Sequence, residues 1–227
     1  MSRPLVKISF MAGSTTEKPT QVATEKAKTY HHGDLPAALR AATAELITEK
    51  GPTGFSLREV ARRAGVSHAA PAHHFGDSKG LLTSVAAEGF HTLVSAFNAL
   101  QDIADPIQRL TAMGKAYVRV ALENPGHFGV MCSHELVDGD DEEFCEIAGR
   151  AFEILVETVS EIAQKHNPNL NIEAAATWVW SGVHGLAVLL PGFDNLDEKA
   201  GTNNVDLLID QFTDLNMNGI FSGTAAL

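Results

Sequence analysis

The 227-residue sequence predicts an all-α protein in which a small three-helix unit precedes a larger helical part. Three observations support this fold class. Apolar residues recur at intervals of three and four, as on one face of a helix, and no segment shows the alternation typical of a strand. The 44% hydrophobic content can fill a substantial core. The parts also differ in charge, because residues 1–82 contain 11 Lys and Arg against 7 Asp and Glu, whereas residues 83–227 contain 6 against 21.

Residues 1–29 show no sustained periodicity, so we expect a flexible arm. The apolar run from Ile8 to Ala12 is too short to span a membrane and lacks the core of a signal peptide, which predicts a cytoplasmic protein. Met11 is an alternative start of the chain. Only two cysteines occur, Cys132 and Cys145, which suits a reducing compartment and offers no disulfide framework.

The first helix is predicted between Asp34 and Gly51. Asp34 is a favourable cap, Pro36 falls in the first turn, and Gly51 with Pro52 ends the helix. Spacings of four, three and four residues give one apolar face, formed by Leu35, Leu39, Ala42 and Leu46.

The second helix is predicted to begin directly after Ser56. Ser56 and Glu59 form the S-x-x-E capping box, in which each side chain accepts a backbone N–H of the first turn. Phe55 and Val60 have the spacing of a hydrophobic staple. Gly65 ends the helix, because glycine adopts a left-handed conformation at little cost and lets the chain turn sharply.

A third helix of about two turns is expected to follow, with Ser67 as its cap and Pro71 early in it. The small side chains of Ala69, Ala70 and Ala72 would permit close approach to a flat or grooved partner. Two short helices around a glycine turn are typical of a helix-turn-helix, so DNA is the first candidate partner.

The stretch SLREVARRAGVSHAAPAHHF, with YHHGDLPAALRAATAELITEKG before it and GDSKGLL after it, resembles the DNA-binding domain of the TetR family of bacterial transcriptional regulators. The resemblance implies a DNA-binding domain over residues 30–82 and a helical ligand-binding and dimerisation domain over residues 83–222. It also implies that Arg58 reaches a guanine or a nearby phosphate. The implied DNA contacts are Ser56, Arg58, Ser67, His68, Ala69, Ala70, Ala72, His73, His74 and Lys79.

Two positions depart from the family pattern. Ala72 stands where the family usually has a phosphate-binding tyrosine, and Ser78 stands where it usually has a lysine, with Lys79 as a substitute one position later. Each change removes a phosphate contact, so we expect weaker or redistributed phosphate binding. The acidic remainder of the chain is expected to repel a duplex everywhere except at the basic face.

The larger part is read as a series of amphipathic helices around one unusually apolar segment. Helices are predicted over residues 79–103, 106–123, 142–166 and 204–217. The segment AAATWVWSGVHGLAVLL, residues 174–190, is apolar nearly all round but is interrupted by Ser181 and His184. It is too short to cross a bilayer, so protein must cover it on more than one side, which suggests a partner subunit.

The motif WSGVHGLA, from Trp180 to Ala187, resembles the Trp-His-Gly signature of one subgroup of TetR C-terminal domains. Together with the last helix, this segment is expected to form a four-helix dimer interface, in which Gly182 and Gly185 allow close helix approach. The expected interface residues are Trp180, Val183, His184, Leu186, Leu208 and Phe212.

The resemblance implies a ligand-responsive regulator, most often a repressor, that binds a palindromic operator as a homodimer. A small apolar or aromatic effector would release it from DNA. The expected pocket residues are Met113, Tyr117, Phe128, Met131, Phe152, Leu155 and Trp178. No catalytic motif is present, so neither an enzyme nor a cofactor is predicted.

Two alternatives stay open. Cys132-Ser133-His134, with His127 nearby, could contribute metal ligands, which would make the protein a metal-responsive regulator of the same fold. This cluster has no second group beside it, so no metal site is assigned. The other alternative is a helical dimer with no DNA-binding role.

Overall fold

The computed structural model describes residues 34–192 and 205–221, with side chains of the last helix described for residues 207–215. All regular structure in these ranges is helical, which confirms the predicted fold class. The expected arm and Met11 lie outside the described residues. The helices are α1 (Leu35–Lys50), α2 (Leu57–Ala64), α3 (Ala70–Phe75), α4 (Ser78–Asn98), α5 (Pro106–Glu123), α6 (Pro125–Met131), α7 (Glu142–His166), α8 (Ile172–Leu189), the 3₁₀ helix η1 (Leu190–Gly192) and α10 (Val205–Phe221).

The first two helices begin and end as their capping residues predict. Asp34 accepts a first-turn backbone N–H at 3.1 Å, and Ser56 Oγ accepts the N–H of Glu59 at 3.3 Å. Gly65 is left-handed with φ of 69°. The Glu59 carboxylate binds Lys50 Nζ at 2.5 Å instead of completing the capping box.

Two predicted boundaries were wrong. Ser67 does not cap the third helix, because residues 67–69 form a turn in which the Ser67 carbonyl accepts the N–H of Ala70 at 3.0 Å. The helix α3 therefore has only six residues. The helix α4 ends at Asn98 rather than near 103, because residues 99–103 turn through i to i+3 hydrogen bonds such as Ile103 N–H to the Leu100 carbonyl at 3.1 Å.

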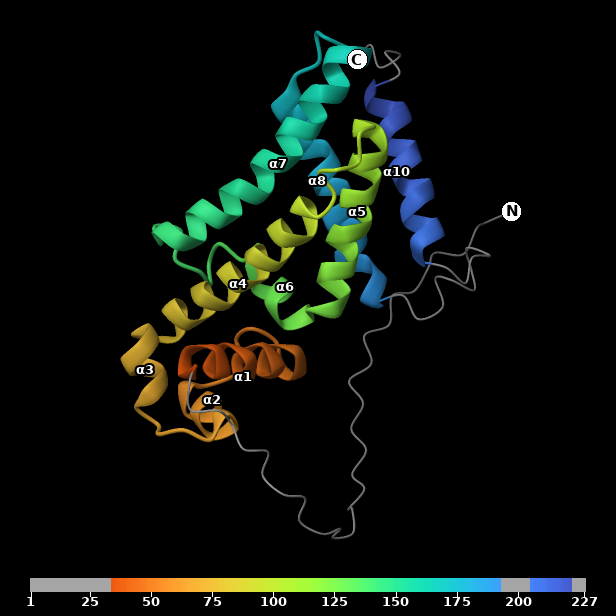
Figure 1. Cartoon of the computed structure of the whole chain (residues 1–227). Helices are drawn as coiled ribbons and strands as arrows, with labels where there is room; N and C mark the ends of the chain where they lie inside the picture. Colours follow the sequence, from red (N-terminus) through yellow and green to blue (C-terminus); the bar gives the residue numbers. More distant parts are fainter. Residues whose placement is uncertain (1–33, 193–204, 222–227) are drawn as a thin grey trace, which may run out of the picture. The chain divides into compact units, whose positions relative to one another are not determined.

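The helices bury two clusters of apolar side chains. In Figure 1, α1, α2 and α3 gather at one end and α4 leads from them to the remaining helices. The small cluster joins α1, α2, α3 and the start of α4 around Leu39, Leu46, Val60 and Leu81, all fully buried. The large cluster joins α4, α5, α6, α7, α8 and α10. Since α4 contributes to both clusters and α6 packs against α1, the two are mechanically connected.

None of the described helices is long and apolar enough to cross a membrane. The nearly apolar segment around Trp180 lies in α8, which buries Val179, Val183 and Ala187 against the large cluster.

Candidate functional site

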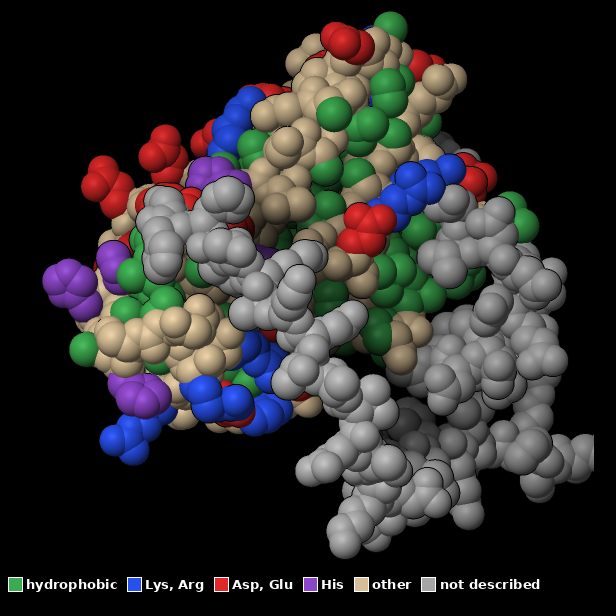
Figure 2. Space-filling model, turned by 60° about the horizontal axis from the view of Figure 1, so that its bottom comes forward, with side chains coloured by type: hydrophobic (Ala, Val, Ile, Leu, Met, Phe, Trp, Pro, Cys, Tyr) green, Lys and Arg blue, Asp and Glu red, His purple; other side chains and the backbone are tan. Residues whose placement is uncertain are grey.

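The side chains predicted to contact DNA lie on an exposed polar face of α2, α3 and the start of α4. Figure 2 shows Lys and Arg side chains gathered at the lower left of the coloured atoms, with a His side chain beside them. The exposed candidates are Ser56, Arg58, Ser67, His68, Ala69, Ala72, His73, His74 and Lys79. Ala70 is the exception and corrects the prediction, because it is only 8% exposed and packs into the small cluster.

The Lys and Arg side chains of this face differ in whether an acidic side chain of the protein pairs with them. Arg63 binds both carboxylate oxygens of Glu49 at 2.7 Å, and this bond holds the pKa of Glu49 below its usual range. Lys50 is paired with Glu59. Arg58 forms no ion pair among the described residues and is exposed, so its guanidinium is available to an external acceptor.

Lys79, at the start of α4, meets an acidic loop of the larger part. Its Nζ lies 3.3 Å from Asp138 Oδ1. The backbone N–H of Asp138 donates to Thr83 Oγ1 at 2.8 Å, which fixes the loop on α4. The protein therefore holds a carboxylate beside Lys79, the lysine that the sequence predicts as a substitute for the family's phosphate contact.

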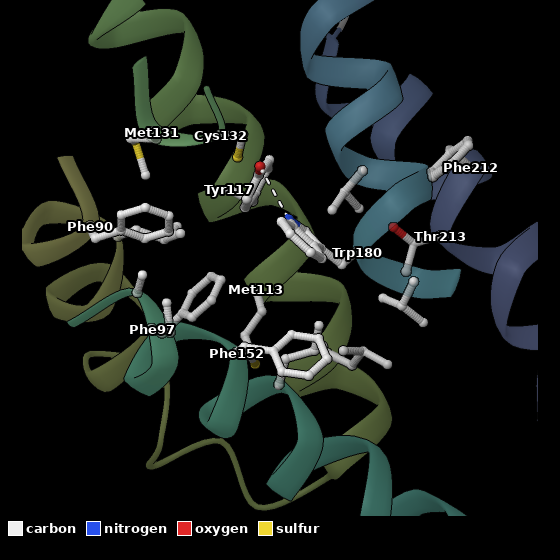
Figure 3. A pocket seen from close by; sticks show the side chains of 18 of the residues that line it. Phe90, Phe97, Met113, Tyr117, Met131, Cys132, Phe152, Trp180, Phe212 and Thr213 are labelled. Atoms are coloured by element: carbon white, nitrogen blue, oxygen red, sulfur yellow. Dashed lines mark hydrogen bonds between the residues drawn. The ribbon is translucent and has the colours of Figure 1, made fainter. Parts of the chain in front are cut away.

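A cavity of about 190 Å³ lies inside the large cluster, between α4, α5, α7, α8 and α10 (Figure 3). No Lys, Arg, Asp or Glu side chain lines it within the described part of the chain. The lining residues are Phe90, Leu93, Phe97, Leu110, Met113, Gly114, Tyr117, Met131, Cys132, His134, Phe144, Ala148, Ala151, Phe152, Leu155, Val179, Trp180, Val183, Phe212 and Thr213.

One polar cluster interrupts the apolar wall. The hydroxyl of Tyr117 lies 2.8 Å from His184 Nδ1 and 3.4 Å from Trp180 Nε1, the second contact being the dashed line in Figure 3. Burial raises the pKa of Tyr117, with Cys132 as a further cause, and burial lowers the pKa of His184. A neutral His184 therefore accepts the tyrosine proton through Nδ1, and the phenol oxygen accepts the indole N–H of Trp180.

Comparisons with known proteins match both parts of the fold. Residues 39–85 match the model of bacterial regulatory proteins of the tetR family, and residues 110–210 match the tetracyclin repressor-like C-terminal domain. The chain belongs to the TetR family. It is a transcriptional regulator with a helix-turn-helix of the kind that binds DNA, which points away from an enzyme.

Known relatives of this TetR-family regulator are distant in sequence. An uncharacterized HTH-type transcriptional regulator of Mycobacterium tuberculosis is 24% identical over 70% of this chain and 77% of its own. A structure of unknown function from Rhodococcus sp. RHA1 is 28% identical, with TM-score 0.69 over 86% of this chain and all of that one. FadR from Bacillus subtilis, in complex with stearoyl-CoA, is 16% identical, with TM-score 0.65 over 81% and 98%.

Most of the side chains predicted to line the cavity do line it, but Trp180 occupies the wall where Trp178 was predicted. Met113, Tyr117, Met131, Phe152 and Leu155 line the cavity. Trp178 does not, and its side chain is 63% exposed, whereas Trp180, assigned to the dimer interface, is in the wall. Two residues along a helix turn the side chain by about 200°, so one tryptophan must face away from the other.

Other predicted roles also change, because the structure shows which face of each helix is buried. Phe128 does not line the cavity but packs edge-on against Tyr117, with ring centroids 6.0 Å apart. Val183 and Phe212 were expected at the interface and line the cavity instead. The cavity is also lined by three residues that were not predicted to line it, although the sequence places each on an apolar helix face: Phe90, Phe97 and Phe144. Only the packing of α4 and α7 against α5 shows that those faces meet one space.

A second apolar surface lies on the outside of α8 and α10. On α8, Trp178, Val188 and Leu189 are exposed, and Ser181 and Gly185 lie between them on the same face, with open space where a Cβ of Gly185 would stand. On α10, Leu207 and Leu215 are 42% and 74% exposed. Of the predicted interface residues, Leu186 packs partly buried on the large cluster, His184 bonds Tyr117, and Leu208 is half-buried. The outward-facing residues were missed because the sequence does not fix which side of α8 the core covers.

The carboxylate of Glu88 connects helices of the small and large clusters. Glu88 of α4 accepts Arg40 Nε of α1 at 3.2 Å and His127 Nε2 of α6 at 3.3 Å. The bond from His127 and the charge of Arg40 hold the pKa of Glu88 below its usual range. At Gly126, a Cβ would overlap the Ala44 carbonyl, so α6 touches the α1 backbone directly. The other end of α6 reaches the cavity at Met131 and Cys132.

The suggested metal ligands do not assemble. Within the described ranges, no three His, Cys, Asp or Glu side chains lie close enough to hold a metal ion. His134 and Cys132 lie at the cavity, whereas His127 bonds Glu88. No observation therefore favours the metal-responsive alternative.

Proposed function

We propose that this TetR-family regulator is a homodimeric repressor that binds a palindromic operator and is released by a small apolar or aromatic effector. The observation that carries the proposal is the composition of α4. Its first turn holds Lys79 on the DNA-binding face, and its middle supplies Phe90 and Phe97 to the cavity wall. A molecule that fills the cavity thus contacts the same helix that supports the helix-turn-helix.

The DNA contacts come from short elements. Arg58 is an exposed cation on α2 with no ion pair among the described residues, and the turn from Ser67 to Ala69 precedes α3. One helix of this length reads only a few base pairs. Two copies related by a two-fold axis would place their recognition helices about 34–36 Å apart, which matches successive major grooves and requires a palindromic site.

The dimer surface is proposed on the exposed apolar face of α8 and α10. Trp178, Val188 and Leu189 would pack against their counterparts, with Leu207 and Leu215 beside them. A monomer that left these side chains in water would expose a continuous apolar face, which is typical of a protein interface. Ser181 and Gly185 supply the small side chains that allow the two α8 helices to approach.

Release is proposed to pass through α4 and α6. An effector shifts the equilibrium only if it binds the released state more tightly, typically with about 1–3 kcal/mol of coupling free energy. Movement of the cavity wall at Met131 would be transmitted along α6 to the backbone contact at Gly126, and through Glu88 to α1 and α4. The stearoyl-CoA complex of the Bacillus subtilis neighbour supports a small-molecule effector in this fold.

Selection of bound DNA from fragmented genomic DNA at two salt concentrations tests the proposal. The expected result is enrichment of one palindrome and a steep fall in affinity with added salt, because phosphate contacts release counterions. If no fragment is enriched at either salt concentration, the protein is a helical dimer without a DNA-binding role.

A further inference from the structure

No Lys, Arg, Asp or Glu side chain lines the cavity within the described part of the chain. The imidazole of His134 also lines it but is exposed to solvent. His184 stands behind Tyr117, and burial lowers its pKa, so it is neutral at pH 7. A buried carboxylate would therefore lose its hydration without a Lys or Arg of the described wall to offset that loss, which disfavours its binding.

The hydrogen-bonding groups of the wall are also few. Thr213 Oγ1 donates its proton to the Ile209 carbonyl at 2.8 Å, and the Tyr117 hydroxyl donates to His184. The indole N–H of Trp180 makes a long bond of 3.4 Å to Tyr117, so a better-placed acceptor can take it over. The phenol oxygen of Tyr117, which also has the Cys132 thiol as a polar neighbour, would then be open to the same group. Trp180 and Tyr117 thus offer one place for a polar group that accepts, donates or does both, and Thr213, Cys132 and His134 are the other polar side chains of the described wall.

The size of the cavity limits the apolar part of the ligand. A cavity of about 150 Å³ lined by apolar side chains accommodates benzene, and this one measures about 190 Å³. Several of its walls are rings, among them Phe90, Phe97, Phe152 and Trp180, which favour edge or offset packing with an aromatic guest (Figure 3).

We infer that the effector is an uncharged aromatic molecule of one or two rings, with a single hydroxyl or carbonyl group bound between Trp180 and Tyr117. This inference rests on the proposed function, since it names the class of molecule that the cavity takes. It separates this chain from the FadR neighbour, whose structure contains stearoyl-CoA, because no Lys or Arg of the described residues lines this wall to bind the phosphate groups of coenzyme A. It also disfavours cations, because the rings attract them but no carboxylate among the described lining residues offsets their desolvation.

Four probes with one carbon skeleton test the charge requirement. They are 4-phenylbutan-1-ol, 4-phenylbutanoate, 4-phenylbutylammonium and butylbenzene, each titrated into the full-length protein by calorimetry at pH 7. The alcohol should bind at least about tenfold more tightly than either ion, because only the ions leave a charge unpaired. An ion that binds as tightly as the alcohol overturns the inference, as does the absence of binding by both uncharged probes.

The variant Tyr117→Phe tests the position of the polar group. It keeps the ring that packs on Phe128 and removes only the hydroxyl. The alcohol should bind about three- to tenfold more weakly to the variant, whereas butylbenzene should bind equally to both proteins. An equal loss for both probes would show a damaged cavity wall and would contradict a polar subsite at Tyr117.

Operator binding, measured in parallel on the selected DNA, separates the two proposals. If the wild-type protein binds no operator but keeps its preference for the uncharged probe, the regulatory role is wrong and the ligand class stands. If it binds operator and prefers an ion, the regulatory role stands and the ligand class is wrong.

Discussion

The two clusters of buried side chains differ in how completely side chains fill their interiors. The small cluster closes on itself around Leu39, Leu46 and Val60, and it directs its polar and charged residues outward to the DNA-binding face. The large cluster leaves a cavity of about 190 Å³ in its middle, next to an exposed apolar face on α8 and α10. A filled interior holds a recognition surface in one geometry, whereas unfilled volume lets a ligand change the packing of the helices around it. This difference is the basis of the proposal that the small cluster stays rigid and the large cluster responds to a ligand.

The largest effect is expected at the surface outside the large cluster. Leu215→Asp should dissociate the dimer, because it would place two unpaired carboxylates against an apolar face, at a cost of several kcal/mol. Leu215 is 74% exposed, so the fold of each subunit should survive. Analytical ultracentrifugation should show a monomer for this variant and a dimer for the control Leu215→Met. A dimer in both would remove α10 from the interface.

A matched pair of core truncations sharpens the comparison between the interiors. Leu46→Ala in the small cluster should lower the free energy of unfolding more than Leu155→Ala at the cavity wall, both within about 2–5 kcal/mol. Leu46 is fully buried in the small cluster, whereas Leu155 already borders empty space and has fewer contacts to lose. Urea denaturation at equal protein concentration measures both. Equal losses would show that the cavity wall is as well packed as the small cluster.

The smallest effect is expected where the two regions meet, at Lys79 and Asp138. Asp138→Asn should tighten binding to every DNA sequence by up to about 1 kcal/mol, because it frees Lys79 from an exposed ion pair. In a Lys79→Gln background, the same change should have a smaller effect, and Asp140→Asn serves as a control from the same loop. Fluorescence anisotropy with specific and scrambled duplexes provides the measurement. A gain restricted to the specific duplex would contradict a phosphate role for Lys79.

Most of the fold follows from local signals in the sequence. Asp34 and Ser56 accept the first-turn N–H groups that their positions predict, and Gly65 adopts the left-handed conformation expected of it. The start of α3 could not be found in this way. Ser67 has the chemistry of a cap, but the chain uses its carbonyl in a turn before Ala70.

The sites were harder to predict than the helices because they depend on which face each helix buries. The segment around Trp178 and Trp180 is apolar nearly all round, so its periodicity does not distinguish inside from outside. The packing of α8 against its neighbours places Trp180 in the cavity wall, whereas the side chain of Trp178 is 63% exposed. The exposure of Arg58 was easier to predict, because a charged side chain between the apolar positions of a short helix lies on the face opposite to the core.

The claim that α2 and α3 read a base sequence is tested most directly by Arg58→Ala. Its affinity for the selected palindrome and for a scrambled duplex should be measured against wild type and against Arg62→Ala, an exposed arginine of the same helix. We predict a loss of about 1–3 kcal/mol per half-site for Arg58→Ala on the palindrome, little loss on the scrambled duplex, and a similar small loss on both duplexes for Arg62→Ala. An equal loss on both duplexes for Arg58→Ala would make Arg58 a phosphate contact and contradict its role in sequence reading.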